Sequence, residues 1–435
     1  MVKLKLMTNA SPKWLSPDDA IRLIGSDQNV VVSHASAEPP HFFRLIGERA
    51  REIHGTRIFC ANPGRSWSCF SDPGLASHVV FEVFFLSQAV RQSLGFGHVH
   101  HVPAHMSRWA RHILNGKRRI HVYWGTCSPP GPDGHVSLGL NACYEPEVLA
   151  RADLVILEVN PRMPRTYGAT RVPLDRVHYF IEQPEAPPTH ASPAPGAEEL
   201  LIGGHVAELV PDGATLQLGI GAIPNAIGKS LAVKRNLGVH TEMVNDAIVD
   251  LYRAGAIDGS MKTLWPGKII GVFVYGSRAL YDFVDNNPEV ELHPASIVND
   301  VVTIGRNSKM TSINTAVEVD LTGQVCSESV GHYEISGVGG ASDTHAGARR
   351  SEGGRGIIAL RSMTRDGLHS KIVHTLAPGA KVSISRNDID TVVTEFGVAE
   401  LAGKNVADRV RAMIAIAHPA VREELMSEAR RLAYL

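Results

Sequence analysis

Short, continuously apolar runs alternate with amphipathic stretches along most of this chain. Such runs are typical of buried parallel strands, and apolar residues at helical spacing between them predict helices. The predicted strands lie at 29–33, 57–60, 121–124, 153–159, 215–218, 238–242, 269–275, 301–304, 357–360 and 382–385. The principal predicted helices lie at 198–210, 224–231, 244–252 and 406–435. This β-α alternation indicates layered α/β domains.

A segment rich in proline and alanine, QPEAPPTHASPAPGA at 183–197, interrupts this alternation. It holds too many prolines for a helix or a central strand, so we expect an exposed linker. The α/β pattern on either side predicts an N-terminal domain at 1–182 and a C-terminal domain at 198–435. We therefore expect a duplicated α/β architecture with a cleft between the two halves.

The composition is that of a balanced globular chain. Its 435 residues carry 43 Lys and Arg against 44 Asp and Glu, so no basic surplus points to nucleic acid. The first residues lack the apolar core of a signal peptide, and the most apolar run, 79–86, is far too short to span a bilayer. Five cysteines without a CxxC pair suit a reducing compartment. We expect a cytoplasmic protein that binds neither nucleic acid nor a membrane.

The stretch GVHTEMVND at 238–246 holds the first candidate for chemistry. It places Glu242 at the carboxyl end of a predicted strand, directly before a helix that Asn245 or Asp246 can cap. Ligands of open α/β sheets bind at such strand ends, where a carboxylate could be a base, a metal ligand or a nucleophile. An isolated glutamate at a helix start more often only favours the helix dipole. Both interpretations are open at this point.

Two glycine loops could present backbone N–H groups to a ligand. In LQLGIGAIPNAI, 216–227, a glycine pair joins a strand to a helix, but the third glycine of a dinucleotide fingerprint is missing. In SGVGGASD, 336–343, three glycines leave the backbone open to an oxyanion. Tight turns that need glycine only for their geometry explain both loops about as well. One helix and one strand separate the first loop from Glu242, so we expect the two on neighbouring strand ends.

Two further clusters have ambiguous roles. The histidines of HVHH, 98–101, and His105 make a zinc or transition-metal site conceivable, but no HExxH motif accompanies them and Pro103 breaks any helix between them. We favour histidines that hold no metal. The turn SPPGPDGH, 128–135, is too elaborate for a simple connector, and Gly134 permits a positive φ. This turn either packs or binds.

Together these motifs resemble the acetyl-CoA hydrolase/transferase family, and within it the 4-hydroxybutyrate and butyryl-CoA:acetate CoA-transferases. The similarity covers nearly the whole chain, and its motifs follow the family's order. The matching segments are SPPGPDGHVSLG (128–139), EVNPRMPRTYG (158–168), DGATLQLGIGAIPNAI (212–227), LGVHTEMVNDAIVDL (237–251), INTAVEVDLTGQVCSES (313–329), SGVGGASD (336–343), SRNDIDTVVTEFGVAEL (385–401) and AHPAVREEL (417–425). The resemblance implies two related open α/β domains of the CoA-transferase type, with the active site in the cleft between them.

The resemblance also implies a mechanism and a set of site residues. Glu242 would be the nucleophile of a ping-pong reaction that passes through a glutamyl-CoA thioester. Asn299 and Gln217 are the candidate polar residues of the site. The two glycine loops would present backbone amides to the reacting carbonyl, and the residues assigned to them are Gly219, Ile220, Gly221, Gly337, Val338, Gly339 and Gly340.

The implied partners are an acyl-CoA and a small carboxylate such as acetate, with no metal, no cofactor beyond coenzyme A and a homodimeric assembly. Candidates for binding the CoA phosphates are Lys309, Arg355 and Arg386. Thr344 and Arg361 stand where relatives usually carry phenylalanine and proline, which leaves the acyl substrate open. An acyl-CoA hydrolase on the same scaffold and a non-catalytic CoA-binding protein are the alternative functions.

Overall fold

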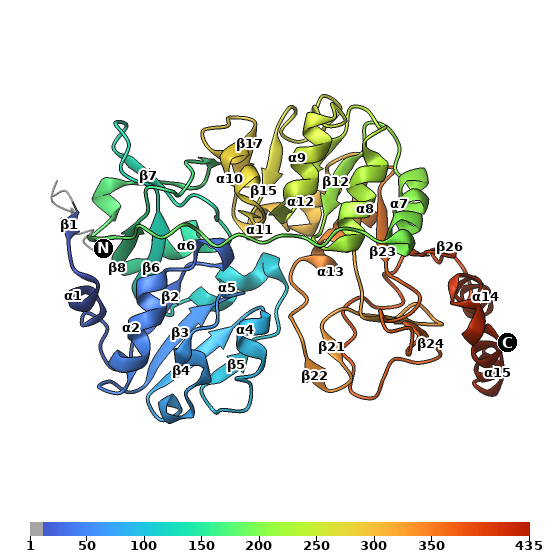
Figure 1. The fold of residues 1–435 in the computed structure, drawn as a ribbon, viewed down its shortest axis with the longest axis horizontal. Coiled ribbons are helices and arrows are strands. Elements are labelled where there is room, and N and C mark those ends of the chain that lie inside the picture. The colour runs from blue at the N-terminus through green and yellow to red at the C-terminus, as the bar shows by residue number, and fades with distance from the viewer. Residues whose placement is uncertain (1–11) are drawn as a thin grey trace. The chain divides into compact units, whose positions relative to one another are not determined.

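The computed structural model describes residues 12–435, which fold into two compact α/β units (Figure 1). Unit 1 comprises the described residues up to Pro103, together with Arg108–Thr189 and Phe273–Pro294. Unit 2 comprises Ala104–Ser107, His190–Val272 and Ala295–Leu435. Each unit is built on a mainly parallel sheet, so the predicted α/β fold class is confirmed.

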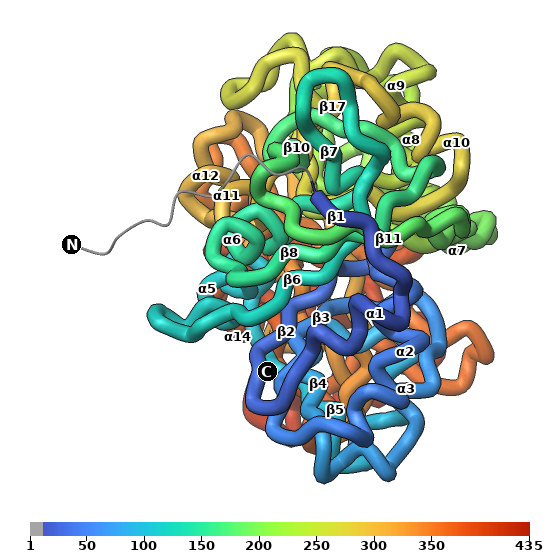
Figure 2. The backbone as a smooth tube through the Cα atoms, turned by 90° about the vertical axis from the view of Figure 1, so that its left-hand side faces the viewer, coloured from blue at the N-terminus to red at the C-terminus, as the bar shows by residue number. Residues whose placement is uncertain are grey.

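Unit 1 contains a sheet of parallel strands in the order β1-β11-β8-β6-β2-β3-β4-β5. Figure 2 shows β2, β3, β4 and β5 side by side, in chain order. The central strands are largely buried, which is why the sequence there consists of continuous apolar runs. The bounds are Lys13–Trp14 (β1), Asn29–Val32 (β2), Thr56–Cys60 (β3), Val79–Val83 (β4), Val99–His101 (β5), Ile120–Cys127 (β6), Ala152–Val159 (β8) and Tyr179–Glu182 (β11).

The helix α2 (Pro40–Ala50) packs on this sheet through its aromatic side. The ring of Phe42 contacts that of Trp124 at 5.5 Å between centroids. Glu158, at the end of β8, accepts hydrogen bonds from the first N–H groups of α2, at 3.3 Å from His41 and 3.1 Å from Phe42. Because it is buried, its pKa is raised to about 7. Glu158 therefore has a structural role as the cap of α2. The other helices of unit 1 are α1 (Pro17–Ile21), α3 (Ser68–Ser71), α4 (Gln88–Arg91), α5 (Trp109–Leu114), α6 (Glu145–Leu149) and α10 (Arg278–Val284).

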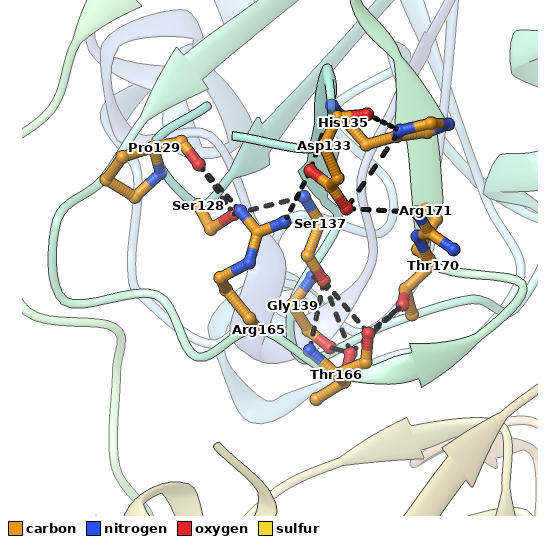
Figure 3. A network of polar contacts seen from close by, with 10 residues as sticks. All are labelled: Ser128, Pro129, Asp133, His135, Ser137, Gly139, Arg165, Thr166, Thr170 and Arg171. Atoms are coloured by element: carbon orange, nitrogen blue, oxygen red, sulfur yellow. Dashed lines mark hydrogen bonds and ion pairs between the residues drawn. The ribbon is translucent and has the colours of Figure 1, made fainter. Parts of the chain in front are cut away.

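The turn SPPGPDGH of unit 1 is held in place by two arginines (Figure 3). Arg171 donates a hydrogen bond to Asp133 at 2.9 Å, and Arg165 donates to the carbonyl of Pro129, also at 2.9 Å. Arg165 belongs to the motif EVNPRMPRTYG, so the two motifs pack against each other. Gly134 has the positive φ, 71°, that the sequence predicted. The turn therefore packs within its own unit.

Unit 2 contains a second sheet, whose strands follow the order β26-β25-β23-β18-β12-β13-β15. All neighbours are parallel except β25 and β26. The chain order reverses between β12 and β18, as in the doubly wound nucleotide-binding folds, where ligands bind outside the carboxyl ends of the strands. The bounds are Thr215–Leu218 (β12), Gly238–His240 (β13), Ile269–Gly271 (β15), Met310–Asn314 (β18), Arg355–Ala359 (β23), Thr391–Thr394 (β25) and Gly397–Glu400 (β26).

The helices of unit 2 follow the predicted alternation, with one interruption. The predicted helix at 406–435 is divided at Pro419 into α14 and α15, which lie at the C-terminal end of the chain (Figure 1). Val410 and Met413 of α14 join a core with Val392 and Ala399 of the sheet. The bounds are Ala197–Leu209 (α7), Ala222–Leu231 (α8), Asp246–Arg253 (α9), Ala295–Val298 (α11), Val301–Gly305 (α12), Ala341–Arg350 (α13), Val406–Ile416 (α14) and Arg422–Arg431 (α15).

The division into units differs from the predicted domains most at residues 273–294, and the short segment Ala104–Ser107 of the predicted N-terminal domain belongs to unit 2. Residues 273–294 follow the linker in the sequence, but they belong to unit 1. There β17 (Val290–Leu292) pairs with β9 (Tyr167–Gly168), and the N–H of Val274 donates to the carbonyl of Leu140 at 2.8 Å. These backbone hydrogen bonds join residues far apart in the sequence, so no local pattern could have predicted them.

Two of the predicted strands are wrong. Residues 301–305 form the helix α12, whose N-terminus is capped by Asp300 through a 2.8 Å hydrogen bond from the N–H of Thr303. Ile304 packs there in a small core of unit 2. Residues 382–385 form only an isolated bridge, between Ile384 and Val325. β-Branched residues favoured a strand in both places, but the cap and the tertiary packing decided the structure.

Candidate active site

Glu242 lies at the carboxyl edge of the sheet of unit 2, as predicted. The strand β13 ends at His240, and the carbonyl of Glu242 accepts a hydrogen bond from Val272 at 2.9 Å, which fixes its backbone. The helix α9 follows, and Asn245 caps it by accepting the N–H of Ile248 at 3.3 Å. Of the two caps that the sequence allowed, Asn245 is the one observed.

Two hydrogen-bond donors meet the carboxyl group of Glu242. The Asn299 side chain donates to Oε2 at 3.3 Å, and the N–H of Gly340 donates as well. Asn299 is itself fully buried, and its Oδ1 has no hydrogen-bond partner among the described residues. Glu242 as a residue is only half-buried, so part of it remains accessible to a substrate.

The surroundings of Glu242 bring the pKa of its carboxyl close to neutral pH. Burial of the carboxyl raises its pKa to about 7, against the hydrogen bond from Asn299. The charge of Asp343 adds to the rise, and the N–H of Gly340 opposes it. Asp343 is held by Ser107, which donates its N–H at 3.1 Å and its hydroxyl at 2.9 Å. The sequence placed Asp343 in the second glycine motif without a role, and this arrangement supplies one.

The pKa of Glu242 predicts the pH dependence of the reaction. If Glu242 is the nucleophile that the family resemblance implies, only its carboxylate can attack, and kcat/KM is expected to rise with pH through about 7 and to level off above it. Asp343→Asn, which removes the neighbouring negative charge but keeps an oxygen for Ser107, should shift the profile to lower pH. The measurement is kcat/KM between about pH 5.5 and 8.5. A wild-type profile that is flat across neutrality contradicts the role of Glu242.

The second glycine loop approaches the carboxyl of Glu242 closely. A Cβ atom on Gly340 would lie 1.8 Å from Glu242 Oε2 and 2.1 Å from Asn299 Nδ2, so no larger residue fits. Gly340 is also the N-cap of α13. The backbone of this loop and the N-terminus of the ten-residue helix α13 therefore lie next to the carboxylate of Glu242.

Asn245 ties the first glycine loop to the turn that carries Glu242. Its Nδ2 donates to the carbonyl of Gly219 at 2.7 Å and to that of Leu218 at 3.2 Å. The loop continues through Gly221, whose φ of 117° favours glycine, into α8. Asn245 thus caps a helix with its oxygen and fixes the loop with its nitrogen.

We expect Asn245→Asp to separate these two roles. Aspartate keeps an oxygen for the N–H of Ile248 but loses the donor to Gly219 and sets a negative charge against its carbonyl. The CoA-transfer activity that the family resemblance implies should fall about tenfold, while the free energy of unfolding changes by roughly 1 kcal/mol. Asn405→Asp, at the exposed cap of α14, is the matched control. Unchanged activity in Asn245→Asp contradicts the positioning role.

Gln217 lies in a buried polar network behind the first loop. Its Oε1 accepts from the hydroxyl of Ser312 at 2.7 Å and from the N–H of Ile313 at 3.1 Å. The oxygen of the same hydroxyl lies 3.0 Å from Thr344 Oγ1, and Asn314 donates to Thr344 at 3.2 Å. Thr344, which stands where relatives usually carry phenylalanine, therefore belongs to a hydrogen-bonded network that joins β12 and β18 to α13.

A pocket of about 380 Å³ opens at the same edge of the sheet. The loops after β12, β18 and β23 line it, including Ile220 and Gly221 of the first glycine loop. Its cations are Arg361, Arg365 and Lys371, none of which was among the predicted CoA-binding residues. The available signal was the strand end, since Arg361 comes directly after the predicted strand 357–360.

The basic residues chosen from the sequence lie elsewhere. Arg355 is the first residue of β23 and pairs with Glu400 at 2.7 Å. Lys309 directly precedes β18, and the exposed Arg386 precedes β25. These strands are parallel to β12, so all three residues lie at the amino edge of the sheet, opposite to Glu242. The structure does not bring Lys309, Arg355 or Arg386 to the carboxylate.

The cysteines and histidines have other surroundings. All five cysteines are buried, and burial raises the pKa of Cys60, Cys69 and Cys127 far above that of a free thiol. His98 is buried, with Nε2 2.9 Å from the carbonyl of Cys69. Within residues 12–435, no group of three or more His, Cys, Asp or Glu side chains is placed to hold a metal ion. In the same part of the chain, no helix has the length and apolar character needed to cross a membrane.

The fold and the site together define an α/β protein of two units, in which the desolvated carboxylate of Glu242 lies at the end of a strand. The sequence matches the Acetyl-CoA hydrolase/transferase N-terminal domain over residues 9–189 and the corresponding C-terminal domain over residues 276–429. The chain belongs to the acetyl-CoA hydrolase/transferase family.

Individual relatives cover almost the whole chain. It is 37% identical to the succinyl-CoA:cyclohexane-1-carboxylate CoA transferase of Geobacter metallireducens, over 97% of this chain and 95% of the relative. It is 39% identical to the 4-hydroxybutyrate coenzyme A transferase of Clostridium kluyveri, over 96% of this chain and 97% of the relative. The crystal structure of a 4-hydroxybutyrate CoA-transferase from Porphyromonas gingivalis superposes with a TM-score of 0.81 at 32% identity, over 97% and 98% of the two chains.

Proposed function

We propose that this CoA-transferase moves coenzyme A between a short-chain acyl-CoA and a carboxylate such as acetate, with Glu242 as the nucleophile. The observation that carries the proposal is the carboxyl group of Glu242, which is desolvated, hydrogen-bonded by Asn299 and in contact with the Gly340 backbone. The similarity to CoA-transferases that act on acyl-CoA esters supports the same reaction class.

The reaction begins with two exchanges on Glu242. A carboxylate oxygen of Glu242 attacks the thioester carbonyl, so that a C–O bond forms, the C–S bond breaks and CoA leaves as a thiolate. The thiolate then attacks the glutamyl carbonyl of the mixed anhydride and releases the first carboxylate. This leaves CoA on Glu242 as a thioester, and no proton is gained or lost overall.

The second half of the reaction repeats these steps with the acceptor acid. The incoming carboxylate attacks the glutamyl thioester and displaces the thiolate, which attacks the new acyl carbonyl and restores Glu242. The scheme requires no metal and no redox cofactor. A homodimer, which the family resemblance implies, stays a prediction.

The surroundings of Glu242 supply two physical contributions to this chemistry. Desolvation makes a carboxylate a stronger nucleophile, because it is not stabilised by a full shell of water. Each attack also creates an oxyanion, which backbone N–H groups stabilise by a few kcal/mol when they are already in position. The loops at Gly219–Gly221 and Gly337–Gly340 are the proposed donors, and the pocket of about 380 Å³ beside Ile220 is the proposed site of the acyl-CoA.

Incubation with labelled acetate and butyryl-CoA tests the proposed function. Transfer requires label in acetyl-CoA, with little free CoA. Borohydride reduction after addition of acyl-CoA, followed by peptide mass analysis, should locate the trapped thioester on Glu242. Free CoA that accumulates without an acceptor identifies a hydrolase instead. CoA binding with neither transfer nor a trapped Glu242 identifies a non-catalytic binding protein.

A further inference from the structure

The pocket beside the first glycine loop has a mixed lining. Ile220, Ile223 and Met363 give it apolar walls, whereas Arg361 and Lys371 bring positive charge from the segment that follows β23. A pocket of about 380 Å³ falls in the range that holds small organic ligands, in which a few polar groups set the orientation. Arg361 and Lys371 are therefore, with Arg365 and Glu199, the charged groups of the lining that can select among ligands.

Arg361 is held in a defined position by the first turn of α7. Its guanidinium pairs with Glu198 and lies 3.6 Å from Glu199, and its side chain is 19% exposed. Its Nε is buried and has no hydrogen-bond partner among the described residues. An anchored guanidinium of this kind loses little conformational entropy on binding, and it keeps a donor that a ligand oxygen could satisfy.

Lys371 adds a second positive charge to the same pocket. Its Nζ donates to the carbonyl of Ala316 at 2.8 Å, which directs it to the loop after β18. Burial, with a smaller contribution from the charge of Arg361, lowers its pKa to about 8, and Glu395 opposes the change. Arg361 and Lys371 therefore lie close enough for their positive charges to repel each other. An anionic group would relieve this repulsion.

We propose that Arg361 and Lys371 form a specificity site for an anionic oxygen group of the acyl-CoA substrate. The group is either the distal carboxylate of a dicarboxylic acyl chain or a phosphate of coenzyme A. The inference rests on the proposed function and goes beyond it, because it names the residues that discriminate between substrates. A site built to pair a charged group rejects an analogue that lacks it more strongly than an apolar pocket rejects a missing methylene.

Three acyl thioester substrates distinguish whether the anion is the distal carboxylate or a phosphate of coenzyme A. Succinyl-CoA carries both the distal carboxylate and the phosphates, butyryl-CoA carries only the phosphates, and butyryl-pantetheine carries neither. Transfer to labelled acetate is measured with each donor for the wild type, Arg361→Gln and Arg361→Lys. Arg386→Gln removes an exposed arginine at the opposite edge of the sheet and is the matched control.

Either of two patterns supports the site. If the anion is the distal carboxylate, Arg361→Gln lowers kcat/KM for succinyl-CoA by about 10- to 100-fold and changes the two butyryl donors by less than about threefold. If the anion is a phosphate, kcat/KM falls by about the same factor for both CoA esters and not for butyryl-pantetheine. In either case, Arg361→Lys should keep part of the activity that Arg361→Gln loses.

Equal losses with all three donors, or no loss with any, overturn the proposal. Arg361→Gln leaves Glu199 buried without its cation, so the variant's thermal unfolding is measured in parallel. Lys371→Met, which leaves that ion pair intact, must show the same donor pattern if the site exists. A wild-type protein that transfers CoA from no donor refutes the proposed function instead, so the two failures are distinguishable.

Discussion

Glu242→Gln is expected to lower kcat for CoA transfer by about a thousandfold or more. Glutamine fills the same space, and its Oε1 can still accept the hydrogen bonds of Asn299 and Gly340. Its amide, however, cannot attack a thioester as a carboxylate does. The loss should therefore fall on kcat, with CoA binding and thermal stability close to those of the wild type. Steady-state transfer to labelled acetate and CoA titration measure the two effects separately.

Glu328→Gln is the matched control for this substitution. Glu328 is another buried glutamate of unit 2, and its Oε1 accepts from the hydroxyl of Ser383 at 2.8 Å, a bond that glutamine can keep. We expect transfer within about threefold of the wild type. Glu242→Gln that retains full activity, or a borohydride-trapped adduct on any other residue, contradicts the assignment of the nucleophile.

Gly340→Ala is expected to reduce kcat by about a hundredfold or more, from a single added methyl group. The new Cβ would meet Glu242 Oε2 at 1.8 Å and Asn299 Nδ2 at 2.1 Å, so the carboxylate and its donor must both move. The backbone of Gly340, with φ −100° and ψ 3°, does not itself exclude alanine. The loss therefore arises from misplaced reacting groups.

Gly204→Ala tests whether the effect is local. Gly204 lies in α7, and a Cβ there meets no atom within 4 Å. Alanine should leave transfer unchanged and stabilise the helix by up to about 1 kcal/mol. In contrast, Gly340→Ala should lower the unfolding free energy by roughly 1–3 kcal/mol. An active Gly340→Ala variant contradicts the close approach of this loop to Glu242.

The main parts of the candidate site could be found from strand ends. Glu242 and the loop at 219–221 each follow an apolar run, and parallel strands bring their carboxyl ends to one edge. The same rule places Arg361, which follows the apolar run at 357–360, at this edge. No pattern in the sequence, however, indicated the carboxylates that pair with Arg361. Glu198 and Glu199, which hold it, come from a helix distant in the sequence.

The choice of Lys309, Arg355 and Arg386 shows why charge without topology misleads. Each is a basic residue inside or beside a matching motif, which made it a reasonable candidate for phosphate binding. In a parallel sheet, however, a residue just before a strand lies a full strand length away from one just after it. Lys309 and Arg386 precede β18 and β25, and Arg355 is the first residue of β23, so all three lie at the wrong edge.

The sequence by itself determined the α/β class, most of the elements and the motif order that identifies the family. These depend on apolar periodicity and short-range turn chemistry, which are written in neighbouring residues. Only the tertiary structure decided that 273–294 joins unit 1, that 301–305 is helical, and that the charge of Asp343 acts on Glu242. These features depend on hydrogen bonds, burial and charge between distant residues. The raised pKa of Glu242 is such a feature, since it belongs to the folded surroundings of the side chain.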